Sequence, residues 1–276
     1  MSSKANRCLK ATSRLANRLT GKTVVVVGAG GNLGPVWVKA LLSEGAHVIA
    51  AGLDASRDEA LASLASAHAG EINIVDVDIS DPGGIDAKAL VGSLGASRID
   101  GVVLNAGIDS IPGSGKVALA DYSFSDWQQV FDVNVFGIVS TLNALVPYLA
   151  NPSSVVTLGS MYGVVSPKAH LYDHFNDGAG SMKNPAYGAS KAALLAVTKQ
   201  YGTYLAPQGV RVNMLTLGGV AAGQDTEFVS KFVDHVPQGR MVERDELPGA
   251  LTFLISDDSS AMTGHNMIVD GGYTTW

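Results

Sequence analysis

Residues 23–34 read Thr-Val-Val-Val-Val-Gly-Ala-Gly-Gly-Asn-Leu-Gly, a run of β-branched residues that leads directly into a glycine-rich turn. An uninterrupted β-branched run is typical of a parallel strand that is buried on both faces. A helical pattern from Pro35 to Ser43 follows the turn. A strand, a glycine turn and a helix in this order direct backbone N–H groups and a helix N-terminus at a pyrophosphate. We therefore predict a dinucleotide site whose contacts include Gly28, Asn32, Leu33 and Gly34.

Further stretches along the chain have the composition of buried strands, and helical patterns separate them. Strands that alternate with helices indicate a parallel sheet covered on both faces. The predicted fold class is α/β: a single-domain Rossmann fold with a doubly wound parallel sheet of about seven strands flanked by helices. No linker divides the chain, so we expect this domain over residues 21–276, after a basic arm at residues 1–20. The further strands are expected at residues 47–51, 71–77, 100–104, 154–160, 211–215 and 267–269.

An acidic residue after the second strand bears on the choice of cofactor. Asp54 lies 20 residues after Gly34. A carboxylate at this offset would accept hydrogen bonds from the adenosine ribose hydroxyls of NAD. Arg57 lies just beyond and could instead pair with the extra phosphate of NADP. The sequence therefore favours NAD and leaves NADP open.

Two more motifs follow strands at the edge where open parallel sheets bind ligands. Asp78 and Ile79 follow the third strand, where a carboxylate can accept from the adenine amino group or can cap the next helix. Asn105-Ala106-Gly107 follows the fourth strand, and its glycine lets the backbone approach a ligand closely. We expect both motifs to contact the cofactor, with a plain structural turn as the alternative for the second.

A tyrosine and a lysine on one helix are the candidate catalytic pair. Pro185 suits the first turn of a helix, and on that helix Tyr187 and Lys191 lie four residues apart and share a face. An ammonium one turn away would favour the phenolate and so lower the tyrosine pKa towards neutrality, as a general acid/base requires. Tyr-x-x-x-Lys is common by chance, so an exposed pair on an amphipathic helix is the alternative.

Two further polar residues are expected near this pair. Asn134 lies among apolar residues in a helical pattern that runs from Ser125 to Leu149. A buried asparagine inside a helix needs a partner, either a backbone carbonyl or a water held beside the lysine. Ser160 ends the fifth strand at the ligand edge, where its hydroxyl could hold a substrate oxygen beside the Tyr187 phenol.

Composition and charge limit the binding partners and the cellular location that we expect for this protein. The formal net charge of -6 disfavours a nucleic-acid or anionic-membrane partner. The sequence has no uninterrupted apolar stretch of the length that spans a bilayer. The single cysteine, Cys8, cannot form an internal disulfide, which suits a reducing cytosol. Residues 1–20 are basic and free of acidic residues, as in a transit peptide or a solvated arm. We expect a cytoplasmic protein.

Taken together, these motifs resemble those of the short-chain dehydrogenase/reductase family over roughly residues 20–276. The resemblance implies that Tyr187 is the general acid/base and that Ser160 orients the substrate oxygen. It implies that Lys191 binds the nicotinamide ribose and lowers the tyrosine pKa, and that Asn134 holds a relay water. It also implies cofactor contacts from Gly218 and Val220, and a homotetramer or homodimer.

The sequence departs from the family pattern at several positions. Asn32 replaces a glycine of the turn, and Leu104 replaces an asparagine. Leu217 replaces a proline and Ala222 a threonine, both near the nicotinamide end of the site. These departures leave the four catalytic positions unchanged.

The segment between the serine and the tyrosine, residues 161–186, is longer than the family pattern implies. It carries polar and aromatic residues that could line a pocket, and the chain resembles a bacterial subgroup in flagellin or surface-sugar modification. That resemblance implies a sugar-like substrate. His170 and His174 lack a matching ligand set, so no metal is expected. The residues in question are His170, Tyr172, Asp173, His174, Phe175, Asn176 and Asp177.

The predicted function is an NAD(P)-dependent oxidoreductase that moves a hydride between nicotinamide and a secondary alcohol or ketone. Its partner is a small molecule. One alternative is a non-catalytic NAD(P)-sensing regulator, which the presence of all four catalytic residues disfavours. Another is a nucleotide-sugar epimerase or dehydratase, which normally carries a larger C-terminal substrate domain, whereas we expect a single domain that ends soon after Asp270-Gly271-Gly272.

Overall fold

The computed structural model of the protein describes residues 17–81, 83–109, 118–175 and 182–276. Cys8 and most of the basic arm expected at residues 1–20 lie outside the described residues, as do Asn176 and Asp177.

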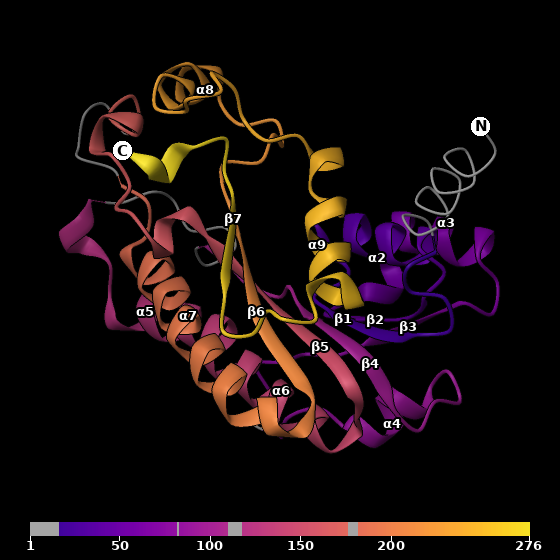
Figure 1. The fold of residues 1–276 in the computed structure, drawn as a ribbon. Helices are drawn as coiled ribbons and strands as arrows, with labels where there is room; N and C mark the ends of the chain where they lie inside the picture. Colours follow the sequence, from indigo (N-terminus) through magenta and orange to yellow (C-terminus); the bar gives the residue numbers. More distant parts are fainter. Residues whose placement is uncertain (1–16, 82, 110–117, 176–181) are drawn as a thin grey trace, which may run out of the picture.

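In the described part of the chain, seven parallel strands form one sheet in the order β3-β2-β1-β4-β5-β6-β7 (Figure 1). β1 pairs with β2 on one side and with β4 on the other, so the winding direction reverses at β1. In doubly wound sheets this reversal point is where ligands bind. The predicted fold class is confirmed. The strands are β1 (Thr23–Val27), β2 (His47–Gly52), β3 (Ile72–Asp76), β4 (Ile99–Leu104), β5 (Leu149–Ser160), β6 (Val210–Leu217) and β7 (Asn266–Val269).

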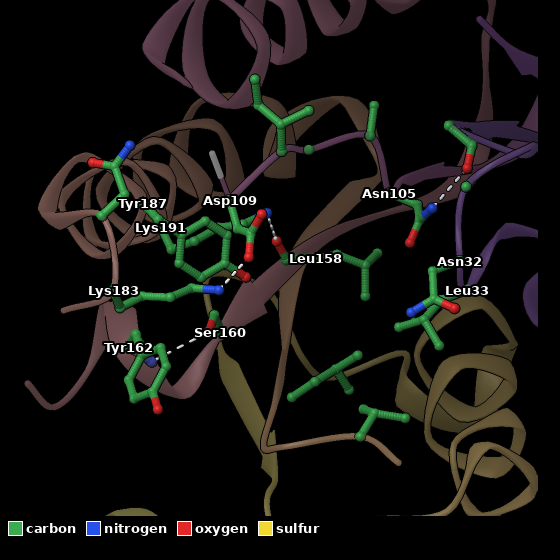
Figure 2. A pocket seen from close by; sticks show the side chains of 18 of the residues that line it. Asn32, Leu33, Asn105, Asp109, Leu158, Ser160, Tyr162, Lys183, Tyr187 and Lys191 are labelled. Carbon is green, nitrogen blue, oxygen red and sulfur yellow. Dashed lines mark hydrogen bonds and ion pairs between the residues drawn. The ribbon is translucent and has the colours of Figure 1, made fainter. Parts of the chain in front are cut away.

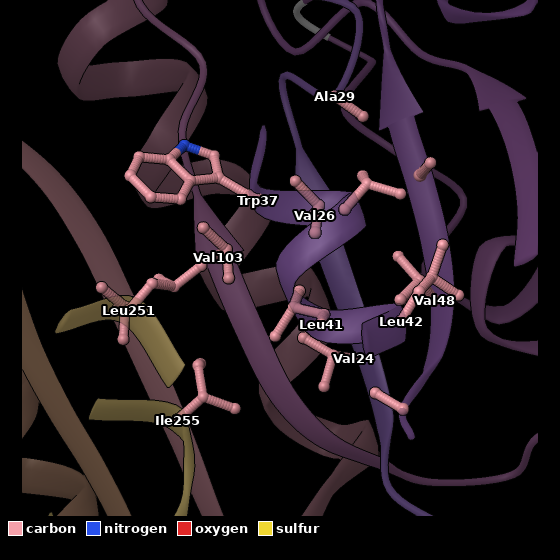
Figure 3. Close-up of a cluster of buried hydrophobic side chains, with 14 of the residues drawn as sticks. Val24, Val26, Ala29, Trp37, Leu41, Leu42, Val48, Val103, Leu251 and Ile255 are labelled. Carbon is pink, nitrogen blue, oxygen red and sulfur yellow. The ribbon is translucent and has the colours of Figure 1, made fainter. Parts of the chain in front are cut away.

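The valines of β1 explain why both faces of the sheet are covered. Successive strand residues point to opposite faces. Val24 and Val26 pack into the core on one face (Figure 3), and Val25 and Val27 pack into the core on the other. The first core contains side chains from α2 (Gly34–Ser43), α3 (Glu59–Ala67) and α9 (Pro248–Ile255). The second contains side chains from α4 (Ala87–Gly92), α6 (Ile138–Leu145) and α7 (Pro185–Leu205).

The long helix expected from Ser125 to Leu149 is divided. It consists of α5 (Phe124–Phe131), a π-helical segment (Asp132–Gly137) and α6, and Leu149 already belongs to β5. Single π-helical turns within α-helices often occur at functional sites. Phe124–Tyr148 is long and apolar enough to cross a membrane by length and composition alone, a test that buried core helices also pass, and 44% of its apolar window is buried inside the protein.

A third apolar cluster lies beyond the carboxyl ends of the strands. There α8 (Thr226–Val233) contributes Phe232, whose ring stacks on Tyr273 at a centroid distance of 5.0 Å. The segment after β5 contributes Met161, Tyr162 and Tyr172 to the same cluster. This cluster holds α8 close to the end of the chain, as Figure 1 shows.

Candidate active site

A cleft of about 890 Å³ opens at the carboxyl ends of the central strands. It brings most of the predicted site residues together, although they come from distant parts of the sequence. Gly34, Asp54 and Asn134 are not among its lining residues. The predicted residues that line it are Gly28, Asn32, Leu33, Asp78, Ile79, Asn105, Ala106, Gly107, Ser160, Tyr187, Lys191, Gly218 and Val220.

The turn after β1 requires glycine at two positions. Gly28 has a φ of +84°, and a Cβ there would lie 2.5 Å from the backbone nitrogen of Ala106. A Cβ on Gly34 would lie 1.9 Å from the carbonyl oxygen of Ala29. These contacts bring the turn close to both the fourth-strand motif and the first helix. The resulting backbone cradle fits the pyrophosphate of a dinucleotide.

Asn105 holds this cradle in place from the side. Its Oδ1 accepts a hydrogen bond of 2.8 Å from the indole nitrogen of Trp37, and its Nδ2 donates one of 2.7 Å to the carbonyl of Gly28. The amide therefore links β4, α2 and the glycine turn. Sequence reasoning missed Trp37. The available signal was a tryptophan on the first helix, because a buried indole N–H usually has a polar partner.

After β2, the two residues expected to discriminate between NAD and NADP pair with each other. Asp54 adopts a left-handed conformation with a φ of +50°, and its side chain is 61% exposed. Its carboxylate lies 3.3 Å from Nη1 of Arg57. Neighbouring Leu53 lines the cleft and Asp54 does not. Recognition of a ribose by Asp54 thus stays a prediction.

Asp78 lines the cleft after β3. Its Oδ1 accepts hydrogen bonds from the backbone nitrogen of Ser80 at 2.8 Å and from the Ser80 hydroxyl at 2.6 Å. The carboxylate thus stabilises the loop in which it lies. Its second oxygen can still accept a hydrogen bond from a ligand. Its contact with adenine stays a prediction.

Tyr187 and Lys191 lie on the first turns of α7, facing the cleft (Figure 2). The side chain of Asn184 caps this helix by accepting from the backbone nitrogen of Ala186 at 3.0 Å. Lys191 Nζ lies 5.9 Å from the Tyr187 ring centroid and donates to the Leu158 carbonyl at 2.9 Å. Burial lowers the pKa of Lys191 to about 8.

Three effects act on the pKa of the Tyr187 phenol, and they do not all have the same sign. Burial raises its pKa, a hydrogen bond with the Ser160 hydroxyl lowers it, and the negative charge of Asp109 raises it. Burial is the largest of the three effects. Proton exchange at neutral pH therefore requires cations beside the ring, since a nearby positive charge favours the phenolate.

Asn134 is fully buried in the π-helical segment behind the cleft. Its Oδ1 accepts from the backbone nitrogen of Ile108 at 2.8 Å, and its Nδ2 donates to the Ile108 carbonyl at 2.8 Å and to the Ser190 hydroxyl at 3.0 Å. Gly107 separates this amide from the lysine, because a Cβ there would lie 3.1 Å from Lys191 Nζ and 3.2 Å from Asn134 Oδ1. The backbone partner is therefore present, and the relay water stays a prediction.

The long segment after Ser160 forms one wall of the substrate end. Tyr172 and Phe175 line the cleft, whereas His170 and His174 do not. The two histidines contact different partners. Nε2 of His170 lies 2.8 Å from Nε2 of His235, and Nε2 of His174 lies 2.9 Å from Oδ1 of Asp225.

A group of possible metal ligands surrounds His174 but already contains a cation. Asp173, His174 and Glu227 offer ligand atoms within 4.8 Å of one another. Lys231 forms ion pairs with both carboxylates, with Nζ 2.8 Å from Glu227. The ammonium thus supplies the positive charge that a metal ion would bring.

Three charged residues at the cleft were missed from the sequence. Arg244 donates a hydrogen bond to Oδ1 of Asn32 in the glycine turn. Lys183 and Asp109 form an ion pair at the substrate end. None has a motif of its own, and their proximity to the site depends on chain segments that are far apart in the sequence.

The chain is similar to known dehydrogenases and reductases. A family model described as enoyl-(acyl carrier protein) reductase matches residues 28–274. The chain is 28% identical over 260 residues to the 3-alpha-(or 20-beta)-hydroxysteroid dehydrogenase of Mycobacterium tuberculosis, which covers 94% of the chain and 91% of the relative.

Two solved structures resemble the whole domain. A short chain dehydrogenase from Leptospira borgpetersenii with bound NAD+ has a TM-score of 0.78 and 26% identity, with coverage of 93% of this chain and 94% of that one. The RhlG/NADP active-site complex from Pseudomonas aeruginosa has a TM-score of 0.79 and 26% identity, with coverage of 94% and 98%.

The matched family model spans most of the sequence, and the chain belongs to this family of short-chain dehydrogenases/reductases. The resemblance inferred from the motifs is confirmed. The protein is an NAD(P)-dependent oxidoreductase, as predicted. The relatives leave its substrate open.

Proposed function

We propose that this oxidoreductase interconverts a secondary alcohol and a ketone, with Tyr187 as the general acid/base. The observation that carries the proposal is that Ser160, Tyr187 and Lys191 line the same cleft, with Lys191 Nζ 5.9 Å from the Tyr187 ring centroid. A substrate oxygen placed between the two hydroxyls would have a proton acceptor and a hydrogen-bond donor within reach.

The residues present fit a nicotinamide dinucleotide. Gly28, Asn32 and Leu33 would hold the pyrophosphate with backbone groups, and Gly107 lets the loop after β4 pass close to Lys191, since a Cβ there would lie 3.1 Å from Lys191 Nζ. Gly218 and Val220 line the same cleft and would contact the nicotinamide end. When bound, the nicotinamide supplies the hydride acceptor or donor.

The protein's own groups would manage the proton and the developing charge. In the oxidation direction the Tyr187 phenolate takes the hydroxyl proton, and Ser160 donates a hydrogen bond to the substrate oxygen as charge develops there. Lys191, with its pKa of about 8, is mostly charged at pH 7 and favours the phenolate. Asn134 positions the backbone of Ile108, next to the path of a relay water towards Lys191.

The substrate end of the cleft supports a ring-shaped substrate that carries polar groups, such as a sugar-like alcohol. Tyr172, Phe175 and Phe228 form aromatic walls. Asp109 and Lys183 place two charged groups among them. Aromatic faces with a few polar groups are typical of sites that bind such molecules.

Three further properties belong to this proposal: one catalytic domain over residues 21–276, a cytoplasmic location, and assembly into a homotetramer or homodimer. Exposed aromatic side chains on the helices of one face support assembly. Phe124, Phe136 and Tyr204 are 82%, 60% and 70% exposed. Aromatic residues are enriched in protein interfaces.

The test is the Tyr187→Phe variant. We expect the quenching of tryptophan fluorescence by NADH to be retained, with turnover of a panel of secondary alcohols and ketones reduced about 10²- to 10⁴-fold. Tyr204→Phe, on the exposed face of α7, is the matched control and should leave turnover unchanged. Full activity in Tyr187→Phe would overturn the proposed role.

A further inference from the structure

An ion pair lies at the substrate end of the cleft, outside the motifs shared with the family. Asp109 lies two residues after Gly107, and Lys183 lies directly before the helix cap Asn184. Their side chains form an ion pair and are 54% and 23% exposed. Both residues line the same cleft as Tyr187.

The lysine of this pair is nearer to the catalytic ring than the lysine of the family motif. Lys183 Nζ lies 5.0 Å from the Tyr187 ring centroid, against 5.9 Å for Lys191 Nζ. Figure 2 shows the Lys183 side chain extending past Tyr187 to Asp109. A cation within about 6 Å of an aromatic ring interacts with it directly.

The backbone on both sides of Lys183 is anchored. The Tyr122 hydroxyl donates to the carbonyl of Met182 at 3.0 Å. On the other side, the Asn184 side chain accepts from the backbone nitrogen of Ala186. The ammonium is therefore attached to a fixed segment, although its side chain is long.

Within the described residues, the charged and hydroxyl groups that face the Tyr187 phenol come from four segments. α7 contributes Lys191, β5 contributes the Ser160 hydroxyl, and the segment before α7 contributes Lys183. The loop after β4 contributes Asp109. Nearby Tyr162 is hydrogen bonded to Tyr172 at 3.0 Å, and burial raises its pKa, so it stays neutral.

We propose that Lys183 and Asp109 act as an opposed charge pair that sets how readily the Tyr187 phenol gives up its proton. Lys183 favours the phenolate and Asp109 opposes it, because like and unlike charges near an acid act with opposite sign. The proposal rests on the proposed role of Tyr187. Lys183 and Asp109 are positioning residues here, since they act through the tyrosine.

The charge of Asp109 already acts in the proposed direction, because it raises the pKa of Tyr187. In the intact pair the two effects partly cancel, since the charges lie close together. Removing either partner removes one of the two opposing effects on the phenol and leaves the other in place. The two single variants must therefore change the phenol in opposite directions, and the double variant must restore the balance.

The experiment is a titration of tyrosine in the protein saturated with NAD+. The ring carbon that bears the hydroxyl is labelled with carbon-13, and its NMR signal is followed against pH. The Tyr187 signal is identified by its absence in Tyr187→Phe. This measurement needs no substrate and no turnover, so it stands apart from any failure of the proposed reaction.

We expect Lys183→Met to move the Tyr187 titration to higher pH and Asp109→Asn to move it to lower pH. At a fixed pH in the titration range, each should change the ratio of phenolate to phenol about three- to tenfold. The double variant should titrate close to the wild type. Lys199→Met, which removes an exposed lysine from the same helix, is the matched control and should cause no change.

Two results would overturn the proposal. Single variants that shift the titration in the same direction would show that the pair only fixes the loop geometry. A double variant whose Tyr187 titration is shifted as far as that of the single variants would also show that the pair only fixes the loop geometry. Two opposed charge effects cancel when both residues are removed, whereas a change in loop geometry does not. Retained turnover in Tyr187→Phe would instead remove the catalytic role of Tyr187 and leave the measured charge effect intact.

Discussion

Asn134 and Ile108 exchange two hydrogen bonds of 2.8 Å between a side-chain amide and both backbone groups of a loop residue. The Asn134 amide thereby pairs with the backbone of the loop that follows β4, as the backbone of an adjacent strand would. Lys191 lies next to this loop, across Gly107. The geometry around Lys191 thus depends on a buried asparagine that does not line the cleft.

Asn134→Ala should lower the free energy of unfolding by about 2–4 kcal/mol, since it leaves buried backbone groups and the Ser190 hydroxyl without this partner. Denaturant titration measures this loss. Asn143→Ala is the matched control, because its amide accepts one hydrogen bond of 2.7 Å from the exposed Tyr201 hydroxyl. We expect a loss of about 1 kcal/mol or less there. Equal losses in the two variants would contradict the importance given to Asn134.

Cofactor choice should depend on the balance between Asp54 and Arg57. We expect the wild-type protein to bind NADH more tightly than NADPH in a fluorescence titration. Asp54→Asn should improve the relative binding of NADPH several-fold, because it frees Arg57 from its ion pair and removes a negative charge near the added phosphate. Arg57→Gln should weaken NADPH and leave NADH unchanged. Identical ratios in all three proteins would show that neither residue reads the ribose.

Lys191 should make stability rise with pH. Its folded pKa of about 8 lies below its ordinary value of 10.5, so the unfolded chain binds more protons between these values. Without added cofactor, the free energy of unfolding should therefore increase between pH 7 and pH 9.5, by about 2 kcal/mol relative to Lys191→Met. Denaturant titrations of both proteins at the two pH values measure this difference. If the two proteins showed the same pH dependence, Lys191 would have the same pKa in the folded and the unfolded chain, and the prediction would be wrong.

Assembly should depend on the exposed aromatic face of α5 to α7. Phe136→Glu should reduce the molar mass seen by light scattering from a homotetramer or homodimer to a smaller species, because it places a charge in the proposed interface. Val164→Glu, a change at another exposed apolar residue, should leave the mass unchanged. A wild-type protein that is already monomeric would remove this part of the proposal.

The fold could be predicted largely from the sequence because its signals are local. The four valines of β1 and the glycines that follow need only short-range reasoning, and every expected strand is present within a few residues. The π-helical segment around Asn134 was not predicted, since an apolar pattern of helical spacing does not distinguish one helix type from another.

The site residues that belong to local motifs could be predicted from the sequence, whereas those brought together only by tertiary contacts could not. Ser160, Tyr187 and Lys191 converge as expected. Asp54 does not reach the cleft because its backbone turns into the left-handed region, which its residue type allows but does not require. The pairing of Lys183 with Asp109 joins residues 74 positions apart, beyond the range of any local pattern.

The cleft is assembled from two separable halves of the polypeptide. The dinucleotide cradle comes mainly from residues 23–107, whereas the aromatic walls come from the segment after Ser160 and from α8. Substrate range and cofactor use can consequently diverge independently during evolution. For protein engineering, exchanging residues 161–175 and 221–237 between homologues is the economical route to new substrates, because Ser160, Lys183, Tyr187 and Lys191 all stay in place.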